Sequence, residues 1–313
     1  MGVAPLGSGP ARLPSCAVWF GLFLPQIAMS FEVILERALA AEAAGFDSLW
    51  FMDHLAAPGA PERDTLEGWT LAAAVAARTT RIRVGHLVTC DPFRHPALLA
   101  KMAATLDVVS GGRLELGLGW GSVEEELTRF GIAAGSPTRR ASRLRETLEV
   151  LDLMFSGDPF DYAGEQVRLE GAIGRPVPVQ AHVPIHLGGA GPRLTMPLVR
   201  EHADWWNCPS YGVERLAELR PLAGGARVSV QHPIGLVPGD GDRDAVEAQT
   251  RRRFGSWGGT LVGTAPELAE ALGAEAAQGV EGFVVQLSDF GTPATIERFM
   301  ETVAPAVRAA AMP

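Results

Sequence analysis

The chain has 313 residues, of which 47% are hydrophobic and 20% are charged, and its formal net charge is -9. Such a chain is long and apolar enough to bury one large core, which excludes an intrinsically disordered protein. The acidic balance, without a basic stripe, argues against nucleic acid as a partner, because phosphates repel such a surface. No apolar run approaches the roughly 20 residues of a membrane-spanning helix, so no membrane partner is expected.

The three cysteines, Cys16, Cys90 and Cys208, are widely spaced and form no CxxC pair. This pattern argues against a disulfide framework and a zinc site, and no metal is expected. Residues 1–15 are rich in Gly and Pro and lack the apolar segment of a signal peptide. They are expected to form a flexible extension before a single domain at 16–313, and the protein is expected to be cytoplasmic.

Short apolar runs alternate with amphipathic helical stretches in the first half of the chain. Residues 17–25 predict a strand that ends in Pro25, and 30–44 predict a helix with Ser30 as its N-cap and Gly45 just after its end. The same periodicities predict strands at 46–52, 81–88 and 113–118 and helices at 66–78, 96–109 and 139–155.

Residues 156–182 interrupt this alternation, because they hold several Gly and Pro residues, and they predict an excursion or a short hairpin over one end of the fold. Four more strands are expected at 183–187, 204–207, 228–237 and 282–287. A helix that ends near Glu201 is expected after the first of these strands, and further helices are expected at 241–254, 266–278 and 294–309.

Eight apolar strands, each followed by a helix, predict an α/β fold of the (β/α)8 TIM-barrel type, with an insertion region at about 156–182 and a single domain. An open, doubly wound sheet is the alternative. It is weakened because no GxGxxG turn follows the first strand.

In such a barrel the active site lies where the carboxyl ends of the strands meet the following loops. Asp53 and His54 end the second predicted strand. A carboxylate beside an imidazole can orient and tune a general acid or base, so this pair is the candidate catalytic group. Structural hydrogen bonding is the alternative interpretation.

Two glycine-rich loops follow other strands. The first, residues 117–122 (GLGWGS), ends the fourth strand, and the second comprises Gly188, Gly189, Ala190 and Gly191. Glycines let a backbone approach a ligand, and the helix that follows offers N–H groups, with Arg193 as a countercharge. Two such loops on one rim predict a phosphorylated cofactor, although tight turns alone also use glycine.

Other motifs are absent or weak. The chain holds no GxSxG nucleophile turn, no GxxxxGK[ST] phosphate loop and no HExxH. Glu124, Glu125 and Glu126 open a predicted helix, where carboxylates favour the helix dipole, and they are interpreted as structural. Trp205 and Trp206 are compatible with ring stacking or with core packing.

Long stretches of the chain resemble the luciferase-like monooxygenase superfamily, especially its coenzyme F420-dependent oxidoreductase branch. The most specific are AEAAGFDSLWFMDHL, LEGWTLAAAVAARTTRIRVGHLVTC, FRHPALLAKMAATLDVVSGGRLELGLGWG and PIHLGGAGPRLTMPLVREHADWWN. The resemblance extends from about Phe20 to Leu287. It implies a barrel with an insertion, in agreement with the strand count, and a deazaflavin or flavin ring at the carboxyl ends of the strands.

The resemblance also implies roles for particular residues. The family often has a non-prolyl cis peptide under the ring, which falls at Leu87–Val88, with Thr89 next in the same cofactor site. His54 would face the reactive edge of the ring. The phosphate and ribityl tail would lie at Gly119 and at 188–191.

Two positions depart from the family pattern. Some F420-dependent relatives carry an acidic glutamate after the glycine loop, and here Ser122 occupies that position, which argues against a sugar-phosphate dehydrogenase. Relatives often carry Gly before Trp, whereas here Trp120 precedes Gly121, so the wall of the cofactor pocket is expected to differ.

The activity that the resemblance implies is an F420-dependent oxidoreductase, foremost an F420H2-dependent reductase. It would pass a hydride to an activated C=C or C=N bond of a small molecule or modified peptide, with the proton from His54 or a water that it holds. An FMN-dependent monooxygenase that uses O2 is the second hypothesis, and a flavin-binding barrel without turnover is the third.

The cofactor tail and the partner copy are further expectations. The anionic tail of F420 is expected to need Arg94, Arg193 or Lys101, although solvated surface charge is the alternative for each. Segments 156–182, 208–213 and 254–260 are expected to shape a substrate pocket. A homodimer is expected to form through helices 66–78 and 96–109.

Overall fold

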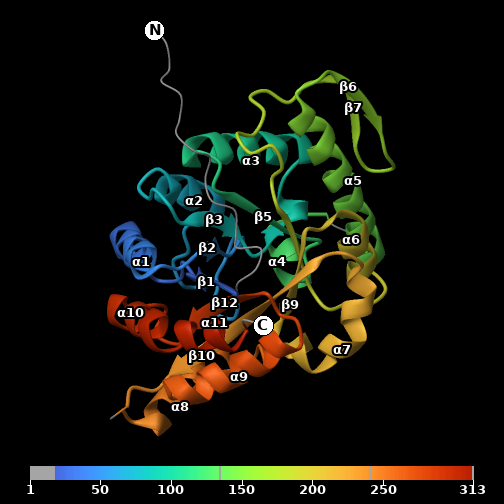
Figure 1. Ribbon diagram of the computed structural model, residues 1–313. Helices are drawn as coiled ribbons and strands as arrows, with labels where there is room; N and C mark the ends of the chain where they lie inside the picture. The colour runs from blue at the N-terminus through green and yellow to red at the C-terminus, as the bar shows by residue number, and fades with distance from the viewer. Residues whose placement is uncertain (1–17, 134, 240, 312–313) are drawn as a thin grey trace.

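The computed structural model describes residues 18–133, 135–239 and 241–311, and the predicted extension at 1–15 lies outside these ranges. Eight parallel strands close into a ring (Figure 1). They are β1 (Trp19–Phe23), β2 (Ser48–Phe51), β3 (Arg83–His86), β5 (Leu114–Gly119), β8 (Ile185–Gly188), β9 (Trp205–Pro209), β10 (Arg227–Leu236) and β12 (Gly282–Leu287). Because β12 pairs with β1 and β10 pairs with β9, the sheet is closed, and the predicted (β/α)8 barrel is confirmed.

Helices surround this ring, as Figure 1 shows. The longer ones are α1 (Phe31–Ala44), α2 (Gly68–Ala76), α3 (Pro96–Ser110), α5 (Pro137–Ser156), α6 (Thr195–His202), α8 (Arg243–Phe254), α9 (Ala265–Ala277), α10 (Pro293–Thr302) and α11 (Ala304–Ala310). Short elements are α4 (Glu124–Arg129), α7 (Leu216–Leu219), η1 (Asp91–Phe93), η2 (Ser210–Arg215), η3 (Arg220–Ala223), β4 (Thr89–Cys90) and β11 (Leu261–Gly263).

Local sequence explains where several helices begin and end. The Oγ of Ser30 accepts a hydrogen bond from Val33 N, and Gly45 has a φ of 90°, which confirms the predicted ends of α1. The prediction of a single helix at 294–309 is wrong, because Val303 separates two helices, α10 and α11. Pro305 has no N–H to continue the hydrogen bonds of α10.

The insertion region contains the predicted hairpin. Strands β6 (Phe160–Ala163) and β7 (Arg168–Ala172) pair antiparallel and project beyond α5 in Figure 1. The carboxylate of Glu146 on α5 accepts hydrogen bonds from the backbone N–H groups of Gln166 and Val167. This contact attaches the hairpin turn to the barrel helices.

The middle of the barrel is packed with large side chains. Trp19, Trp50 and Trp205 fill the middle of the ring, and Trp205 stacks on His186 with ring centroids 5.7 Å apart. His186 Nε2 lies 2.6 Å from the buried carboxylate of Glu115, which also binds Arg83. Trp205 therefore packs in the core, which is one of the two roles, ring stacking and core packing, that its sequence position allowed.

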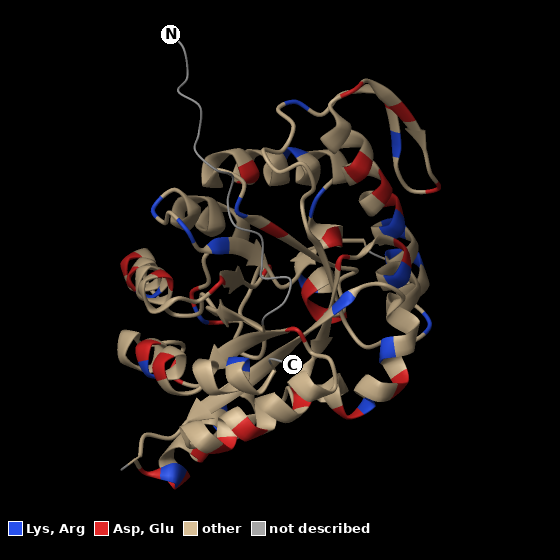
Figure 2. Cartoon of the chain, in the orientation of Figure 1, with Lys and Arg blue, Asp and Glu red and all other residues tan. Residues whose placement is uncertain are grey.

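The outer surface carries mixed charge. Acidic and basic side chains are interspersed along the outer helices (Figure 2). Within the described ranges, no helix combines the length and the apolar character needed to cross a membrane.

Candidate active site

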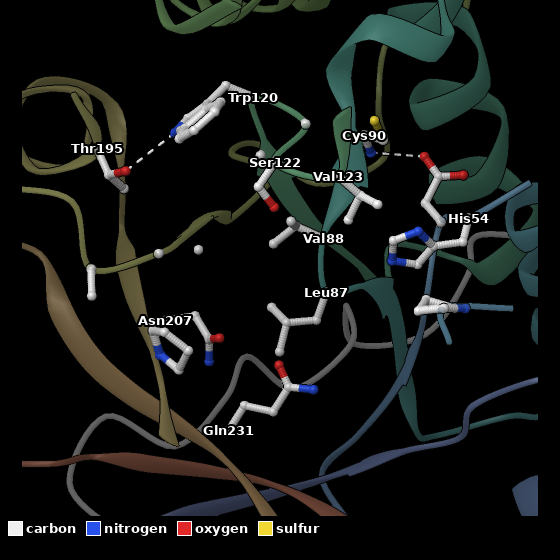
Figure 3. Close-up of a pocket in the computed structure, with 18 of the residues that line it drawn as sticks. His54, Leu87, Val88, Cys90, Trp120, Ser122, Val123, Thr195, Asn207 and Gln231 are labelled. Carbon is white, nitrogen blue, oxygen red and sulfur yellow. Dashed lines mark hydrogen bonds between the residues drawn. The ribbon is translucent and has the colours of Figure 1, made fainter. Parts of the chain in front are cut away.

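A cavity of about 490 Å³ opens at the carboxyl ends of the barrel strands (Figure 3). It is lined by the ends of β2, β3, β5, β8, β9 and β10 and by the loops after them. The predicted site residues that line it are Asp53, His54, Leu87, Val88, Gly119, Trp120, Ser122, Gly188, Gly189, Ala190 and Gly191. Tertiary structure thus brings together residues that the sequence separates by more than a hundred positions.

The peptide bond between Leu87 and Val88 is cis, at the position that the family resemblance implies. Two glycines make room for this segment. A Cβ at Gly119 would lie 2.5 Å from Cγ2 of Val88, and a Cβ at Gly188 would lie 2.9 Å from its Cγ1. Both glycines are therefore required by close packing around Val88, a reason that their motif alone did not reveal.

The second glycine loop is held in place by aromatic side chains. Trp206 Nε1 donates to Gly189 O at 2.7 Å, and Gly189 has a φ of 127°, which favours glycine. Trp120 Nε1 donates to Thr195 Oγ1 at 3.2 Å across the cavity wall (Figure 3). Trp206 therefore positions the loop from the protein core, whereas Trp120 faces the cavity.

Two predicted cofactor residues do not line the cavity. Thr89 is fully buried in β4, because side chains alternate along a strand and its neighbours Val88 and Cys90 face the cavity. Arg193 was expected one turn inside a helix, but α6 begins only at Thr195, so Arg193 precedes the helix and is exposed. The predicted countercharge role of Arg193 is not supported by this geometry.

His54 has a specific partner in this site. Its Nδ1 lies 2.7 Å from Oε2 of Glu126, and Oε1 of Glu126 accepts hydrogen bonds from the N–H groups of Leu55 and Ala56. Glu126 belongs to α4, the helix after the first glycine loop, and its side chain is mostly buried. Glu126 lies in the first turn of α4, as expected, but it also binds His54, a contact that the sequence did not predict.

The hydrogen bonds to Glu126 also determine its charge. Burial raises the pKa of this carboxyl, but the hydrogen bonds from His54, Ala56 and Leu55 outweigh burial and lower the pKa below its usual value. Glu126 is thus ionised at neutral pH and keeps a proton on Nδ1 of His54. Nε2 is the ring nitrogen left for a ligand.

The sequence predicted that the carboxylate of Asp53 orients the imidazole of His54, but this carboxylate binds Arg94 and Cys90 instead. Its Oδ2 and Oδ1 accept hydrogen bonds from Arg94 at 2.6 and 2.8 Å, and Oδ2 also accepts from Cys90 N at 2.8 Å. Adjacent residues at a strand end point to opposite sides, so the carboxylate and the imidazole face different partners. Asp53 ties the end of β2 to the segment after β3.

The remaining charged and thiol groups near the cavity have other partners. Glu124 binds Arg140, and Glu125 binds Arg129, so neither glutamate replaces the acid missing at Ser122. Burial raises the pKa of the Cys90 thiol, and nearby carboxylates raise it further, so this thiol stays protonated.

The cations expected to bind an anionic tail are engaged elsewhere. Arg94 is paired with Asp53 and Glu67, and Lys101 contacts the carbonyl oxygen of Arg175 in the insertion region. None of the described residues that line the cavity is a lysine or an arginine. The cavity therefore offers hydroxyl and backbone groups to a phosphate, and no side-chain cation.

The wall from β9 and β10 was only partly expected. Tyr211 and Trp257, from the predicted segments 208–213 and 254–260, line the cavity, whereas no described residue of 156–182 does. Asn207 and Gln231 also line it, and Gln231 points toward Leu87 in Figure 3. The alternation of the predicted strand at 228–237 is the only sequence signal for Gln231.

The fold and the cavity define a (β/α)8 barrel with a ligand site at its carboxyl end and a cis peptide in the wall of that site. The family model for luciferase-like monooxygenases matches residues 18–227, and the chain belongs to this family.

Similar proteins include two curated relatives. An F420-dependent hydroxymycolic acid dehydrogenase of Mycobacterium tuberculosis is 29% identical over 257 residues, 79% of this chain and 70% of that protein. An F420-dependent glucose-6-phosphate dehydrogenase of Amycolatopsis mediterranei is 34% identical over 166 residues, 51% of this chain and 48% of that protein. The chain spans about half the length of several curated relatives that it matches.

A solved structure shows the same fold. The F420-dependent secondary alcohol dehydrogenase in complex with an F420-acetone adduct superposes with a TM-score of 0.74 at 20% identity, over 93% of this chain and 99% of that one.

Proposed function

We propose that this protein is an oxidoreductase that uses coenzyme F420, as an F420H2-dependent reductase of an activated C=C or C=N bond in a small molecule or modified peptide. The F420-dependent dehydrogenases among its relatives support the cofactor. The observation that carries the proposal is the bond between His54 Nδ1 and Glu126, which leaves one imidazole nitrogen for a ligand at the cavity.

The residues of the cavity fit a flat ring with a phosphate tail. Leu87 and Val88 offer an apolar surface for the ring, and the loop of Gly189 to Gly191 with Thr195 at the start of α6 suits the phosphate. With no lining cation among the described residues, the carboxylates of the F420 tail would extend past the mouth. When bound, reduced F420 supplies a hydride, and the protein positions the reactants.

His54 is the residue that moves a proton in this proposal. Ionised Glu126 accepts the hydrogen bond from Nδ1–H, so Nε2 is the ring nitrogen through which a proton passes to the substrate. The His54 side chain is partly exposed, which lets Nε2 exchange protons with solvent between turnovers. Val123 and Pro58 line the cavity beside this residue.

An FMN-dependent monooxygenase that uses O2 is the second candidate function. One observation favours it: the cavity lacks the lysine or arginine that the polyanionic F420 tail was expected to need, whereas the single phosphate of FMN is suited to backbone groups and Thr195. Both functions place the ring on the same wall, so cofactor affinity separates them.

The first test is a titration of purified protein with F420 and, separately, with FMN, followed by fluorescence quenching. Binding of F420 at micromolar concentration or below, with FMN at least tenfold weaker, is expected. A preference for FMN would contradict the proposal, and oxygen uptake with reduced flavin would then be measured.

The second test is turnover. We expect His54→Ala to lower kcat for F420H2 oxidation by about 10²- to 10⁴-fold on a panel of unsaturated carbonyl compounds and imines, with F420 affinity preserved. His182→Ala, which alters an exposed histidine paired with Asp204, is the control and should keep full activity. Equal activity in both variants would remove His54 from the mechanism. Binding without turnover in the unaltered protein would favour a flavin-binding barrel.

A further inference from the structure

The cavity has two chemically different walls. The wall from β3, β5 and β8 contains the cis peptide and the glycines, and the proposed function assigns it to the cofactor. The opposite wall comes from β9, β10 and the loops after them and contains Asn207, Pro209, Tyr211, Gln231 and Trp257. This second wall is left for the molecule that reacts with the cofactor.

Gln231 has an unused hydrogen-bond donor on this second wall. The side chain is only 4% exposed, and its Nε2 has no partner among the described residues. In register, Gln231 is flanked by Pro209 of β9 and Val284 of β12, neither of which has a polar side chain. Its amide points into the cavity (Figure 3), and a buried donor of this kind is satisfied by a ligand acceptor or a displaceable water.

The neighbouring amide of Asn207 already donates from Nδ2 to Ser229 Oγ at 3.0 Å. The Nε2 of Gln231 has no partner among the described residues and is itself covered, and rotation about the last side-chain bond turns it toward a ligand in the cavity. The charged groups that line the cavity are the carboxylates of Asp53 and Glu126, and no lysine or arginine lines it within the described ranges. A neutral acceptor is therefore favoured over a carboxylate or phosphate on the substrate.

Two aromatic side chains lie at the mouth above this wall. Tyr211 is 60% exposed and Trp257 is 37% exposed, although both line the cavity. The loop of Trp257 is held by Ser210 Oγ, which donates to Gly258 O at 2.7 Å, and by His232 Nδ1 at 3.2 Å from Gly259 O. Exposed rings held in place at a cavity mouth suit a planar, apolar part of a ligand.

We propose that Gln231 is the substrate-specificity residue, and that the substrate is an uncharged, planar carbonyl compound. The Gln231 amide donates to its carbonyl oxygen, and its apolar ring or chain lies against Tyr211 and Trp257. This inference rests on the proposed function and names its substrate class. A hydrogen bond to a carbonyl oxygen also withdraws electrons from a conjugated double bond, which makes that bond a better hydride acceptor.

The test compares benzamide with benzoate, which share a ring and differ in charge at the carbonyl group. Both are titrated by calorimetry or saturation-transfer NMR into the protein alone and into the protein saturated with oxidised F420. Benzamide is expected to bind at least tenfold more tightly than benzoate. Equal affinity for the two probes in both states would overturn the proposal without any variant being made.

Variants of Gln231 test whether this side chain causes the preference for benzamide over benzoate. Gln231→Leu is expected to weaken benzamide binding about tenfold, and Gln231→Met, a second variant with a flexible side chain, should do the same. Gln286→Leu is the matched control, because Gln286 is an equally buried and incompletely bonded amide on the next strand that does not line the cavity. Unchanged benzamide affinity in a folded Gln231 variant would overturn the assignment.

The same samples separate this inference from the proposed function. F420 affinity, measured by fluorescence quenching, should be equal in the unaltered protein and in both Gln231 variants. Loss of the benzamide preference with F420 binding intact would reject only the role of Gln231. Absence of F420 binding in the unaltered protein would reject the proposed function, whatever the benzamide result.

Discussion

Nδ1 of His54 and Oε2 of Glu126 lie 2.7 Å apart, although 72 positions of sequence separate the two residues. The carboxylate also receives the backbone N–H groups of Leu55 and Ala56, so it holds the loop after β2 as well as the imidazole. A histidine held in this way has one defined tautomer and a fixed orientation, which are the requirements of a proton donor at a cofactor edge.

Glu126 is expected to act through His54. Glu126→Gln should lower kcat about 10- to 100-fold and shift the pH profile, because an amide does not keep the proton on Nδ1 as a carboxylate does. F420 affinity should not change. Glu125→Gln, which affects only an exposed pair with Arg129, is the control. An unaltered pH profile in Glu126→Gln would show that Glu126 is only structural.

Gly119 is expected to tolerate no side chain. Gly119→Ala should lower the free energy of unfolding by about 1–3 kcal/mol and weaken cofactor binding, because its Cβ would displace Val88. Denaturant unfolding and fluorescence quenching measure the two effects. Val88→Ala in the same chain should restore part of both losses. Gly225→Ala, where a Cβ meets no atom within 4 Å, is the control.

Asp53 is expected to matter for stability more than for chemistry. Asp53→Asn should lower the free energy of unfolding by about 3 kcal/mol, because it leaves the mostly buried Arg94 without its bidentate partner. Denaturant unfolding measures this loss, and Arg129→Met, in an exposed pair, should cost less than about 1 kcal/mol. Full stability with lost turnover would instead make Asp53 a catalytic residue.

The start of α9 should contribute a pH-dependent stability. Hydrogen bonds from Thr264 N–H, Arg243 and Thr264 Oγ1 lower the pKa of Glu267 from 4.5 to about 2. A lowered pKa in the folded state stabilises above the unfolded pKa, and this contribution disappears as the pH falls through the folded value. The Tm difference between the unaltered protein and Glu267→Gln should thus be full at pH 7 and shrink between pH 4.5 and 2. Glu270→Gln on the same helix is the control.

We propose that two copies associate through α3. Leu98 and Val109 are 54% and 47% exposed, and with Met102 and Thr105 they occupy one stripe of this helix. Leu98→Glu should convert a dimer into a monomer in light scattering at micromolar concentration, whereas Leu39→Glu on α1 should not. A monomer in the unaltered protein would contradict the proposed dimer.

Local patterns in the sequence were enough to predict the barrel strands, most helices, the hairpin after α5 and the loops that form the cavity rim. They succeed because alternation and helical spacing act over a few residues and because strand ends in such a barrel always meet at one face. The cis bond at Leu87–Val88 and the location of His54 at the cavity were expected from the family resemblance and the strand ends.

Pairings between distant side chains were decided by the tertiary structure. Asp53 is adjacent to His54 in sequence but turns to Arg94, while Glu126, in a run of three glutamates, reaches His54. The sequence does not predict which way a side chain points at the end of a strand or in the first turn of a helix. It also did not predict that α6 begins at Thr195, which leaves Arg193 before the helix and outside the cavity. The unpartnered amide of Gln231 became visible only once the barrel closed, because burial and the lack of a partner are properties of packed neighbours and not of a residue type.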